Sequence, residues 1–416
     1  MKNAVLEKKI QLTTLWHTAI AQQKAVALCR LPNQTTQHLI IDFSPQVSKT
    51  KLPIESPQEQ GFAISPFINP NNEHTYFIRA DLYFQVQQGQ AIWQDSYVQS
   101  RNYESINHFW QQIEHAPFTE GIEKIALHLP SITTGFALTE NYLQAERYCQ
   151  MVAKAIQAIE RHEFQKVVLS RYKCKTITEK LNVIQLFETI CQTYPTAFVY
   201  IWYIPYVGCW VGASPEVLIS IDKNAIFRTV SLAGTQAYNP NVKLSKVSWT
   251  QKEIEEQALV SRYIINCFKK IRLREFQEEG PKTVVAGNLV HLKTTFEVDM
   301  QATNFPQLGS VMLDLLHPTS AVCGMPKEPA LRFIRENENY DRSFYTGFVG
   351  MVNIAHETHL FVNLRCMQIL HNKLIFYAGA GITEDSEPEK EWQETEMKCN
   401  TLLSVVERIC PTTDSF

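Results

Sequence analysis

The chain has 416 residues, enough to bury a large core as two or three domains or as one large α/β domain. Its 39 Lys and Arg residues against 42 Asp and Glu give a formal charge of −3, so no basic excess is present to attract nucleic acid or anionic lipid. We therefore expect a small-molecule substrate, with no nucleic acid and no membrane among its partners.

The cysteines and the N-terminus indicate the compartment. Ten cysteines are spread along the chain without a CxxC pair or a Cys/His cluster, which is typical of reduced core residues in a cytoplasmic protein. The first residues lack the apolar segment of a signal peptide, and no run of about 18 uncharged apolar residues could form a membrane helix. We expect a cytoplasmic protein that is a monomer or a weak oligomer.

The first third of the chain is the least informative part. Its polar loops contain proline, and the alternating segment 75–86 is rich in β-forming residues and predicts strands. From residue 140 the pattern is clearer, because apolar residues at helical spacing predict an amphipathic helix within 146–164. The β-branched segment that follows, 165–177, predicts a strand.

Strands and helices alternate through the rest of the chain. Further strands are predicted at 196–204, 208–221 and 225–235. A long helix is predicted at 248–271, and its apolar inner side is expected to carry Ile254, Ala258, Ile265 and Phe268. No internal repeat interrupts this order. The predicted fold class is α+β, with large sheets covered by helices.

The last predicted helix begins with EPEKEWQETEMK, residues 387–398, which holds five glutamates in twelve positions. Ser386 is the expected N-cap, and Pro388 falls in the first turn, where its missing N–H costs nothing. The simplest interpretation of the glutamates is compensation of the helix dipole. An i,i+4 ion pair between Glu394 and Lys398 is also expected.

A metal site is the alternative for some of these carboxylates. Glu391 and Glu394 share one helix face, close to the glycine-rich segment YAGAG, whose backbone lets N–H groups approach a ligand. Carboxylates held in this way repel one another unless a cation joins them, and Mg²⁺ binds one or two protein carboxylates together with water or an anionic substrate. A second acidic cluster, KEIEEQ, places Glu256 on the same helix face as Lys252.

Six motifs taken together resemble the chorismate-utilising, or chorismate-binding, enzymes. They are KVVLSR (166–171), GASPEVL (212–218), SLAGT (231–235), the run HPTSAVCG to YTGFVG (317–350), LRC (364–366) and YAGAGITEDSEPEKEWQETEMK (377–398). They follow the family's order over residues 140–410 and are most similar to those of isochorismate synthases. The resemblance implies the chorismate-binding fold of anthranilate and aminodeoxychorismate synthases, with stacked β-sheets flanked by helices. We expect one domain over 1–416, with a divergent N-terminal part (1–135) and a catalytic core (140–410).

The activity that this resemblance implies is the isomerisation of chorismate to isochorismate by a hydroxymutase, for menaquinone or siderophore biosynthesis. Water adds at C2 and the C4 hydroxyl leaves. Lys166 matches the family's base, Glu216 its acid and His291 its active-site histidine. To remain protonated, Glu216 needs an apolar or electronegative pocket that raises its pKa. Without the resemblance, a strand lysine, a surface glutamate and a core histidine would be the ordinary assignments.

The resemblance also implies a ligand set. Glu256 and Glu394 match the two carboxylates that bind Mg²⁺, and Glu391 lies beside the second. Arginine and tyrosine side chains, with backbone N–H groups, hold the substrate carboxylates. The matching substrate-binding positions are Gly234, Thr235, Ala321, Tyr345, Arg365, Gly379 and Gly381.

Other activities occur on the same fold. Anthranilate and aminodeoxychorismate synthases add ammonia, and salicylate synthase also eliminates pyruvate. The lyases commonly have threonine at the position of Ala321, and HPT at 317–319 resembles the isochorismate branch. Ser320, Cys323 and Lys327 depart from the family pattern without removing a catalytic role. A salicylate, aminodeoxychorismate or anthranilate synthase-type enzyme, and a non-catalytic chorismate-binding homologue, are the alternatives.

Overall fold

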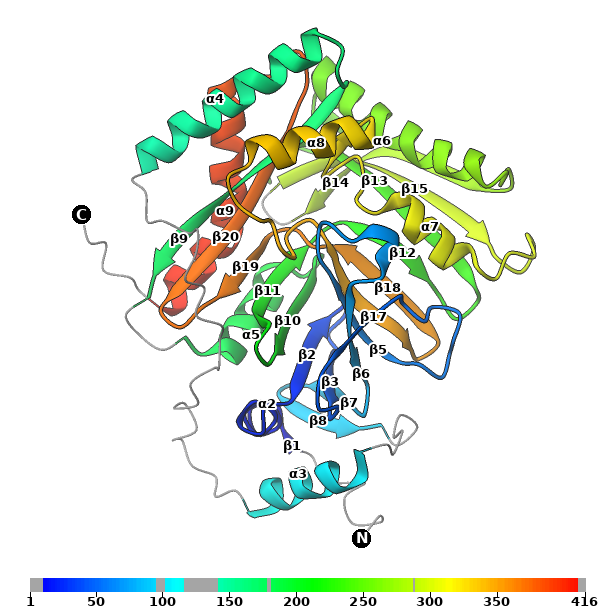
Figure 1. The fold of residues 1–416 in the computed structure, drawn as a ribbon, viewed down its shortest axis with the longest axis vertical. Coiled ribbons are helices and arrows are strands. Elements are labelled where there is room, and N and C mark those ends of the chain that lie inside the picture. Colours follow the sequence, from blue (N-terminus) through cyan, green and yellow to red (C-terminus); the bar gives the residue numbers. More distant parts are fainter. Residues whose placement is uncertain (1–9, 95–101, 116–140, 178–180, 287–288, 411–416) are drawn as a thin grey trace.

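The computed structural model describes residues 10–94, 102–115, 141–177, 181–286 and 289–410. Within these ranges the chain forms two large antiparallel sheets with helices outside them (Figure 1). The predicted α+β class with stacked, helix-flanked sheets is confirmed. No helix in the described ranges is both long and apolar enough to cross a membrane. Residues 1–9, which belong to the N-terminal segment where no signal peptide is expected, lie outside these ranges.

The first sheet combines strands from both ends of the chain. Its order in space is β1 (Ile10–Gln11), β8 (Gln90–Trp93), β7 (Leu82–Gln87), β3 (Gln37–Asp42), β2 (Ala25–Arg30), β10 (Phe198–Ile204), β11 (Gly208–Ser214), β19 (Cys366–Ile369), β20 (Lys373–Ile382), β9 (Lys166–Thr176) and β16 (Gly324–Met325). The segment predicted at 165–177 is therefore a strand, β9, which pairs along its length with β20.

The second sheet also mixes early and late segments. Its order is β14 (Gln277–Ala286), β15 (Leu289–Asp299), β13 (Ile226–Ala237), β12 (Val217–Ile221), β18 (Glu357–Val362), β17 (Phe348–Ile354), β5 (Gly61–Ser65), β6 (Thr75–Arg79) and β4 (Ser48–Thr50). Strands predicted in 75–86 are present as β6 and β7, one in each sheet.

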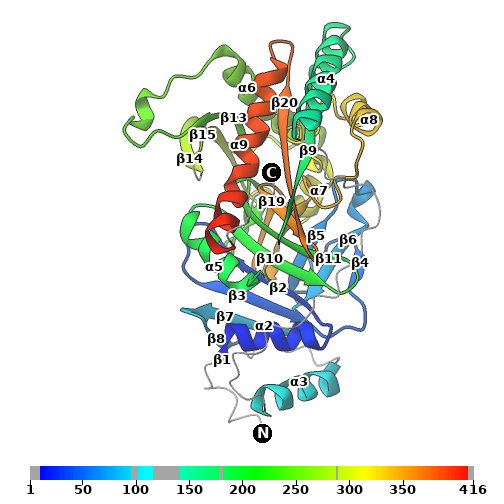
Figure 2. The ribbon, with the colours of Figure 1, turned by 90° about the vertical axis from the view of Figure 1, so that its left-hand side faces the viewer.

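Helices cover the outer faces of the sheets. They are α2 (Leu12–Ala21), α3 (Tyr103–His115), α4 (Asn141–Glu160), α5 (Val183–Thr193), α6 (Gln251–Lys270), α7 (Leu308–Leu316), α8 (Lys327–Asn337) and α9 (Pro388–Ile409), with short 3₁₀ turns at Pro70–Asn72 and Leu244–Lys246. Figure 2 shows α9 lying over β20, with α4 beside it, and these elements are in contact.

The core has several layers. Aromatic side chains from both sheets fill the space between them; Trp202, Trp210 and Phe361 are examples. A second apolar layer joins the first sheet to α2, α5 and α9, and a third joins the second sheet to α6 and α7. Burial of apolar surface on both faces of each sheet explains why the central strands are almost continuous runs of buried residues.

Two local predictions were wrong. In α6 the buried side chains are Gln257, Val260, Ile264, Cys267 and Phe268, whereas Ile254 and Ala258 are exposed. The helix is rotated relative to the prediction because the amide of Gln257 is bonded inward, accepting from Ala233 N and donating to Thr294 Oγ1.

The start of α9 is the second case. The N-cap is Glu387, and no side chain caps it. The Ser386 hydroxyl instead accepts a hydrogen bond from Thr383 N at 3.1 Å and closes the turn before the helix. Pro388 does begin the helix, as its fixed φ favours.

Candidate active site

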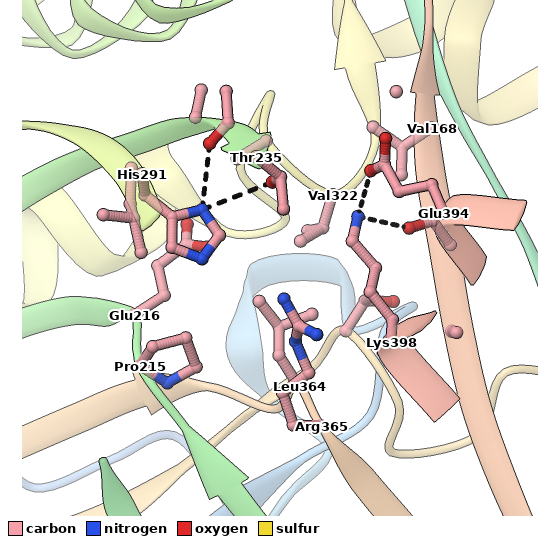
Figure 3. Close-up of a pocket in the computed structure, with 18 of the residues that line it drawn as sticks. Val168, Pro215, Glu216, Thr235, His291, Val322, Leu364, Arg365, Glu394 and Lys398 are labelled. Atoms are coloured by element: carbon pink, nitrogen blue, oxygen red, sulfur yellow. Dashed lines mark hydrogen bonds and ion pairs between the residues drawn. The ribbon is translucent and has the colours of Figure 1, made fainter. Parts of the chain in front are cut away.

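One pocket lies where the β9–β20 part of the first sheet meets β13 and β15 of the second, beneath α6 and α9. Its cavity measures about 80 Å³, or about 690 Å³ when all the space between its walls and the open solvent at its mouth is included. Figure 3 shows Glu216 and His291 on one side of it and Glu394 and Lys398 on the other. Of the predicted site residues, those that line it are Glu216, Gly234, Thr235, Glu256, His291, Ala321, Tyr345, Arg365, Gly379, Gly381 and Glu394.

Lys166, the first residue of β9, lies directly behind Gly381 of β20. Its side chain is 1% exposed, and its Nζ donates to Glu256 Oε1 at 2.8 Å. A Cβ atom on Gly381 would lie 2.8 Å from Glu256 Oε1 and 3.0 Å from Lys166 Cε. Glycine at position 381 therefore leaves the space in which the lysine and the carboxylate meet.

A β-bulge in β13 connects the pocket to α6 and β15. The register shifts between Ala233 and Gln236, and Gly234 has a φ of +67°, which suits glycine. The freed backbone bonds to side chains: Gly234 N donates to Glu256 Oε2 at 3.4 Å, and Gly234 O accepts from the Nδ1 of His291 at 2.9 Å. The SLAGT motif thus orients a carboxylate and an imidazole at the same point.

His291 is buried and neutral. Burial, together with the positive charge of Arg365, lowers its pKa to about 3. Because Nδ1 donates its proton to the Gly234 carbonyl, Nε2 carries a lone pair, and this atom has no partner among the described residues. The ring therefore offers a hydrogen-bond acceptor to the pocket.

Glu216 lies in the turn between β11 and β12, which is held by Val362 N donating to Glu216 O at 3.0 Å. Burial raises the pKa of this carboxyl to about 8, although the charges of Lys166 and Lys398 oppose the rise. Burial therefore keeps the side chain a protonated acid near neutral pH, although charged groups also line the pocket.

Each of the three candidate metal carboxylates is paired with a lysine. Glu256 is paired with Lys166, while Glu391 Oε1 is 2.5 Å from Lys252 Nζ and Glu394 Oε1 is 2.6 Å from Lys398 Nζ, as predicted for that i,i+4 pair. Burial would raise the pKa of Glu256, but Lys166 outweighs it and the pKa is lowered.

Glu391 behaves in the opposite way. Burial, with a contribution from Glu394, raises its pKa despite the Lys252 ammonium. The neighbouring lysines thus favour the charged form of both Glu256 and Glu391, and burial opposes it.

The donor chemistry of this cluster fits Mg²⁺. No group of three His, Cys, Asp or Glu side chains in the described ranges is close enough to form a complete ligand set. Glu256 and Glu394 nevertheless line the same pocket, and Mg²⁺ needs only one or two protein carboxylates when water and substrate oxygens supply the rest. Glu391 lies outside the lining, bonded to Lys252.

Stacked aromatic rings support another wall of the pocket. Trp210 stacks on Tyr377 at 5.1 Å between centroids, and Tyr377 stacks on Tyr345 at 5.5 Å. The Tyr345 ring thus rests on the core and faces Gly379 of β20. Arg365 lies nearby with a φ of +47°, unusual for a residue other than glycine, and burial lowers the pKa of its guanidinium.

The sequence analysis assigned no role in the site to Lys398. Its ammonium lines the pocket and donates to the Gly379 carbonyl at 2.8 Å as well as pairing with Glu394. The signal was present, because position 398 follows Glu394 by one helical turn and so shares its face. Lys166 and Glu391 are the two predicted site residues that lie just behind the lining.

Comparison with known proteins agrees with this geometry. The family model described as "Chorismate binding enzyme" matches residues 65–407. The isochorismate synthase EntC of Escherichia coli (strain K12) is 31% identical over 263 residues, which span 62% of this chain and 66% of that protein. The isochorismate synthase DhbC of Bacillus subtilis (strain 168) is 26% identical over 270 residues, 62% of this chain and 67% of the relative.

Solved structures share the fold over almost the whole chain. MenF, the menaquinone-specific isochorismate synthase from Escherichia coli, superposes with a TM-score of 0.73 at 20% identity, covering 96% of this chain and 93% of that one. Component I of anthranilate synthase from Streptococcus pneumoniae gives a TM-score of 0.64 at 18% identity, covering 91% and 92%. A family match over most of the sequence and a common fold lead to one conclusion: this chain belongs to the chorismate-binding enzyme family.

Proposed function

We propose that this protein is an isochorismate synthase, an isomerase that converts chorismate to isochorismate with Mg²⁺ as cofactor. The observation that carries the proposal is that Glu216, a protonated acid, and Glu256 line one pocket, while the buried Lys166 lies just behind the lining and is bonded to Glu256. The reaction needs an acid and a base on one bound substrate, and these groups supply both. The similarity to EntC, MenF and DhbC supports the same reaction.

The proposed substrate, chorismate, is a dicarboxylate, and we assign one cation to each carboxylate: Arg365 to one and Mg²⁺ to the other. In the proposed complex Arg365 binds the enolpyruvyl carboxylate through its planar fork, with the Tyr345 hydroxyl beside it. Gly379 and Gly381 also line the pocket, and in the proposed complex their N–H groups assist in holding this carboxylate. Glu256 and Glu394 would hold Mg²⁺, and the bound ion would supply positive charge for the ring carboxylate.

The proton transfers are assigned to side chains. In this step Lys166 must act as a neutral amine: its Nζ takes a proton from the water whose oxygen bonds to C2, and the ring double bonds shift as the C4–O bond breaks. Glu216 gives its proton to the departing hydroxyl, which leaves as water. One water is consumed and one released, so the reaction is an isomerisation. The Nε2 of His291 accepts a hydrogen bond from a substrate hydroxyl and fixes the ring between the two groups.

We further propose that residues 1–416 form one domain in the cytoplasm. Strands β2 and β3 of the N-terminal part pair into the same sheet as β10 of the core, and β5 pairs with β17 in the other sheet. The ten cysteines are free thiols, most of them buried, which suits a reducing compartment. The product would enter menaquinone or siderophore synthesis.

Product analysis tests the proposed activity. Purified protein is incubated with chorismate and Mg²⁺, and chromatography separates isochorismate from salicylate, anthranilate and aminodeoxychorismate. Isochorismate as the main product supports the proposal. Salicylate as the main product would assign the chain to the lyases, and unchanged chorismate despite binding would make it a non-catalytic homologue.

Lys166→Ala tests the assigned base. We expect turnover to fall by a factor of about 10³ while Mg²⁺-dependent binding of chorismate persists, because the lysine acts on the water rather than on a substrate carboxylate. Lys175→Ala, farther along the same strand, is the control and should retain wild-type turnover. Full activity in Lys166→Ala would refute the assignment.

A further inference from the structure

A second cavity lies on the other side of Glu216. It measures about 10 Å³, at the lower limit of the space that one water molecule needs. Glu216 borders both this cavity and the main pocket, so its side chain stands between them. Apolar side chains form most of the wall: Val217, Leu218, Val230, Val260, Ile264 and Leu316.

Three residues that carry hydroxyl groups line the same small cavity. The Oγ1 of Thr319 is buried and has no partner among the described residues. Thr229 donates its proton to Leu218 O at 2.7 Å, and Tyr263 donates to Leu315 O at 2.8 Å. Because a hydroxyl oxygen keeps its lone pairs after donating, Thr229 and Tyr263 are free to accept.

We propose that one buried water occupies this cavity, bonded to Thr319 and to the inner oxygen of Glu216, and that Thr319 is thereby a positioning residue for the acid. A cavity lined only by apolar groups stays dry, but this one offers up to four polar partners and room for one water. The water satisfies the Thr319 hydroxyl, which otherwise would be a buried group without a hydrogen bond.

The water has a definite part in the proposed reaction, and the inference rests on that proposed function. It donates to the inner oxygen of Glu216, which leaves the acidic proton on the oxygen that faces the substrate. When that proton moves to the departing hydroxyl, Glu216 becomes a carboxylate, and the existing hydrogen bond stabilises the new charge. No proton passes through the water.

Other charged groups also act on Glu216 and belong in any interpretation of pH dependence. Lys166 of β9, Lys398 of α9 and Arg365 favour its charged form, and Glu256 of α6 opposes it. His291 of β15 faces the same pocket as a neutral ring. A change at Thr319 leaves all five in place, so a shift in the titration of Glu216 reports the loss of the water.

A high-resolution crystal structure of the protein without substrate gives the first test. Density for a water within hydrogen-bonding distance of both Thr319 Oγ1 and Glu216 supports the proposal, and its loss in Thr319→Val would support it further. An empty cavity in the wild-type protein would overturn it. This measurement needs no turnover, so it is distinct from the chromatographic test of the proposed function.

Kinetics give the second test. We expect Thr319→Val to lower kcat about tenfold with little change in KM, because the hydrogen bond acts mainly on the charge that forms during reaction. The loss of activity at high pH should also move to higher pH, because the carboxylate has lost a donor. A purely structural defect would not move this limb.

Two controls accompany these variants. Thr319→Ser keeps the hydroxyl and should stay within about twofold of wild type. Ser320→Ala removes the neighbouring hydroxyl, which is also buried and unpartnered within the described ranges but borders neither cavity, and should do the same. Thr319→Val with wild-type kcat and an unshifted pH profile would overturn the assigned role.

Discussion

Glu216 and Glu256 border one pocket, yet their pKa values move in opposite directions. Burial dominates at Glu216 and raises the pKa to about 8, whereas the direct bond from Lys166 lowers the pKa of Glu256. A pocket that holds one carboxyl neutral and another charged can donate a proton at one point and bind a cation at another. The ion pair with Lys166, and not burial alone, therefore determines that Glu256 is charged while Glu216 is neutral.

Holding Glu216 protonated has a cost that can be measured. Its pKa rises on folding from 4.5 to about 8, so between these pH values the folded protein binds the proton that the unfolded chain releases. The free energy of unfolding should therefore fall as pH rises through this window. We predict that Glu216→Gln unfolds with about 2–4 kcal/mol more free energy than wild type at pH 8, and with a similar value at pH 4.

Urea unfolding of both proteins at several pH values checks this prediction. The exposed Glu336→Gln is the control and should show no pH-dependent gain. A difference between Glu216→Gln and wild type that stays constant from pH 4 to pH 8 would contradict the raised pKa. Turnover of Glu216→Gln should be about 10²–10⁴-fold lower, as for loss of a general acid.

Position 381 requires glycine because two neighbouring side chains leave no room for a Cβ atom, and not because of its backbone conformation. A methyl group there would overlap Glu256 Oε1 and Lys166 Cε, both of which are ends of flexible side chains. We predict that Gly381→Ala folds normally but separates this pair, and that kcat/KM falls about 10²-fold because a displacement near 1 Å is enough for such a loss. Turnover and melting temperature are measured together, and unchanged turnover would contradict the close contact.

The sequence located most of this site through motifs, and its local patterns alone would have missed it. Lys166 and Glu216 look like an edge lysine and a surface glutamate until the fold buries them. The Thr319 cavity was not predictable, because it depends on how α6, α7 and β12 pack against one another. Burial that arises from tertiary packing changes the chemistry of a side chain without leaving any local pattern.

One arginine of β9 fixes the rotation of α9 about its own axis. Arg171 of β9 donates from Nε to Thr395 Oγ1 at 2.6 Å, pairs with Glu396, and stacks its guanidinium 3.8 Å from the centre of the Trp392 ring. These three partners alternate along the helix with Glu391 and Glu394. The arginine thus fixes the helix face that carries the pocket carboxylates.

We predict that Arg171→Met weakens Mg²⁺-dependent chorismate binding about tenfold and lowers kcat/KM by a similar factor, because α9 can then turn about its axis. Arg171→Lys should show almost the same loss of affinity, since an ammonium group cannot reproduce the hydrogen bonds and the aromatic stacking of the planar guanidinium. Lys173→Met, which also loses a bond to Glu396 but lies farther from the pocket, is the matched control. Calorimetric titration measures the affinity, and wild-type affinity in Arg171→Met would contradict this role.

Element type was predictable wherever periodicity was strong. The helices found as α4, α6 and α9 and the strands β9, β10 and β13 have clear 3.6-residue or β-branched patterns. The segment 208–221, predicted as one strand, is two strands, β11 and β12, which belong to different sheets. The inward face of α6 was not predictable, because the buried stripe includes the polar Gln257, whose partners lie on β13 and β15. A polar residue that is satisfied only in the tertiary structure misleads any count of apolar positions.

In the whole molecule, the pocket joins the two sheets. Its walls come from β9 and β20 in one sheet and from β13 and β15 in the other, with α6 and α9 closing over them. The N-terminal strands widen both sheets and bring no residue to this pocket within the described ranges. A ligand that contacts both walls should therefore stabilise the fold as a unit.

Ligand-dependent stability tests this arrangement and the metal together. With Mg²⁺ present and chorismate at about 100 times its dissociation constant, we predict a gain of about 2.7 kcal/mol in the free energy of unfolding over Mg²⁺ alone, seen as a higher melting temperature. Chorismate without Mg²⁺ should give much less, because Glu256 and Glu394 then repel the ring carboxylate. Glu394→Gln should lose the dependence on Mg²⁺, while Glu336→Gln should keep it. Equal stabilisation by chorismate with and without Mg²⁺ in the wild-type protein would show that these two carboxylates do not bind the ion for the substrate.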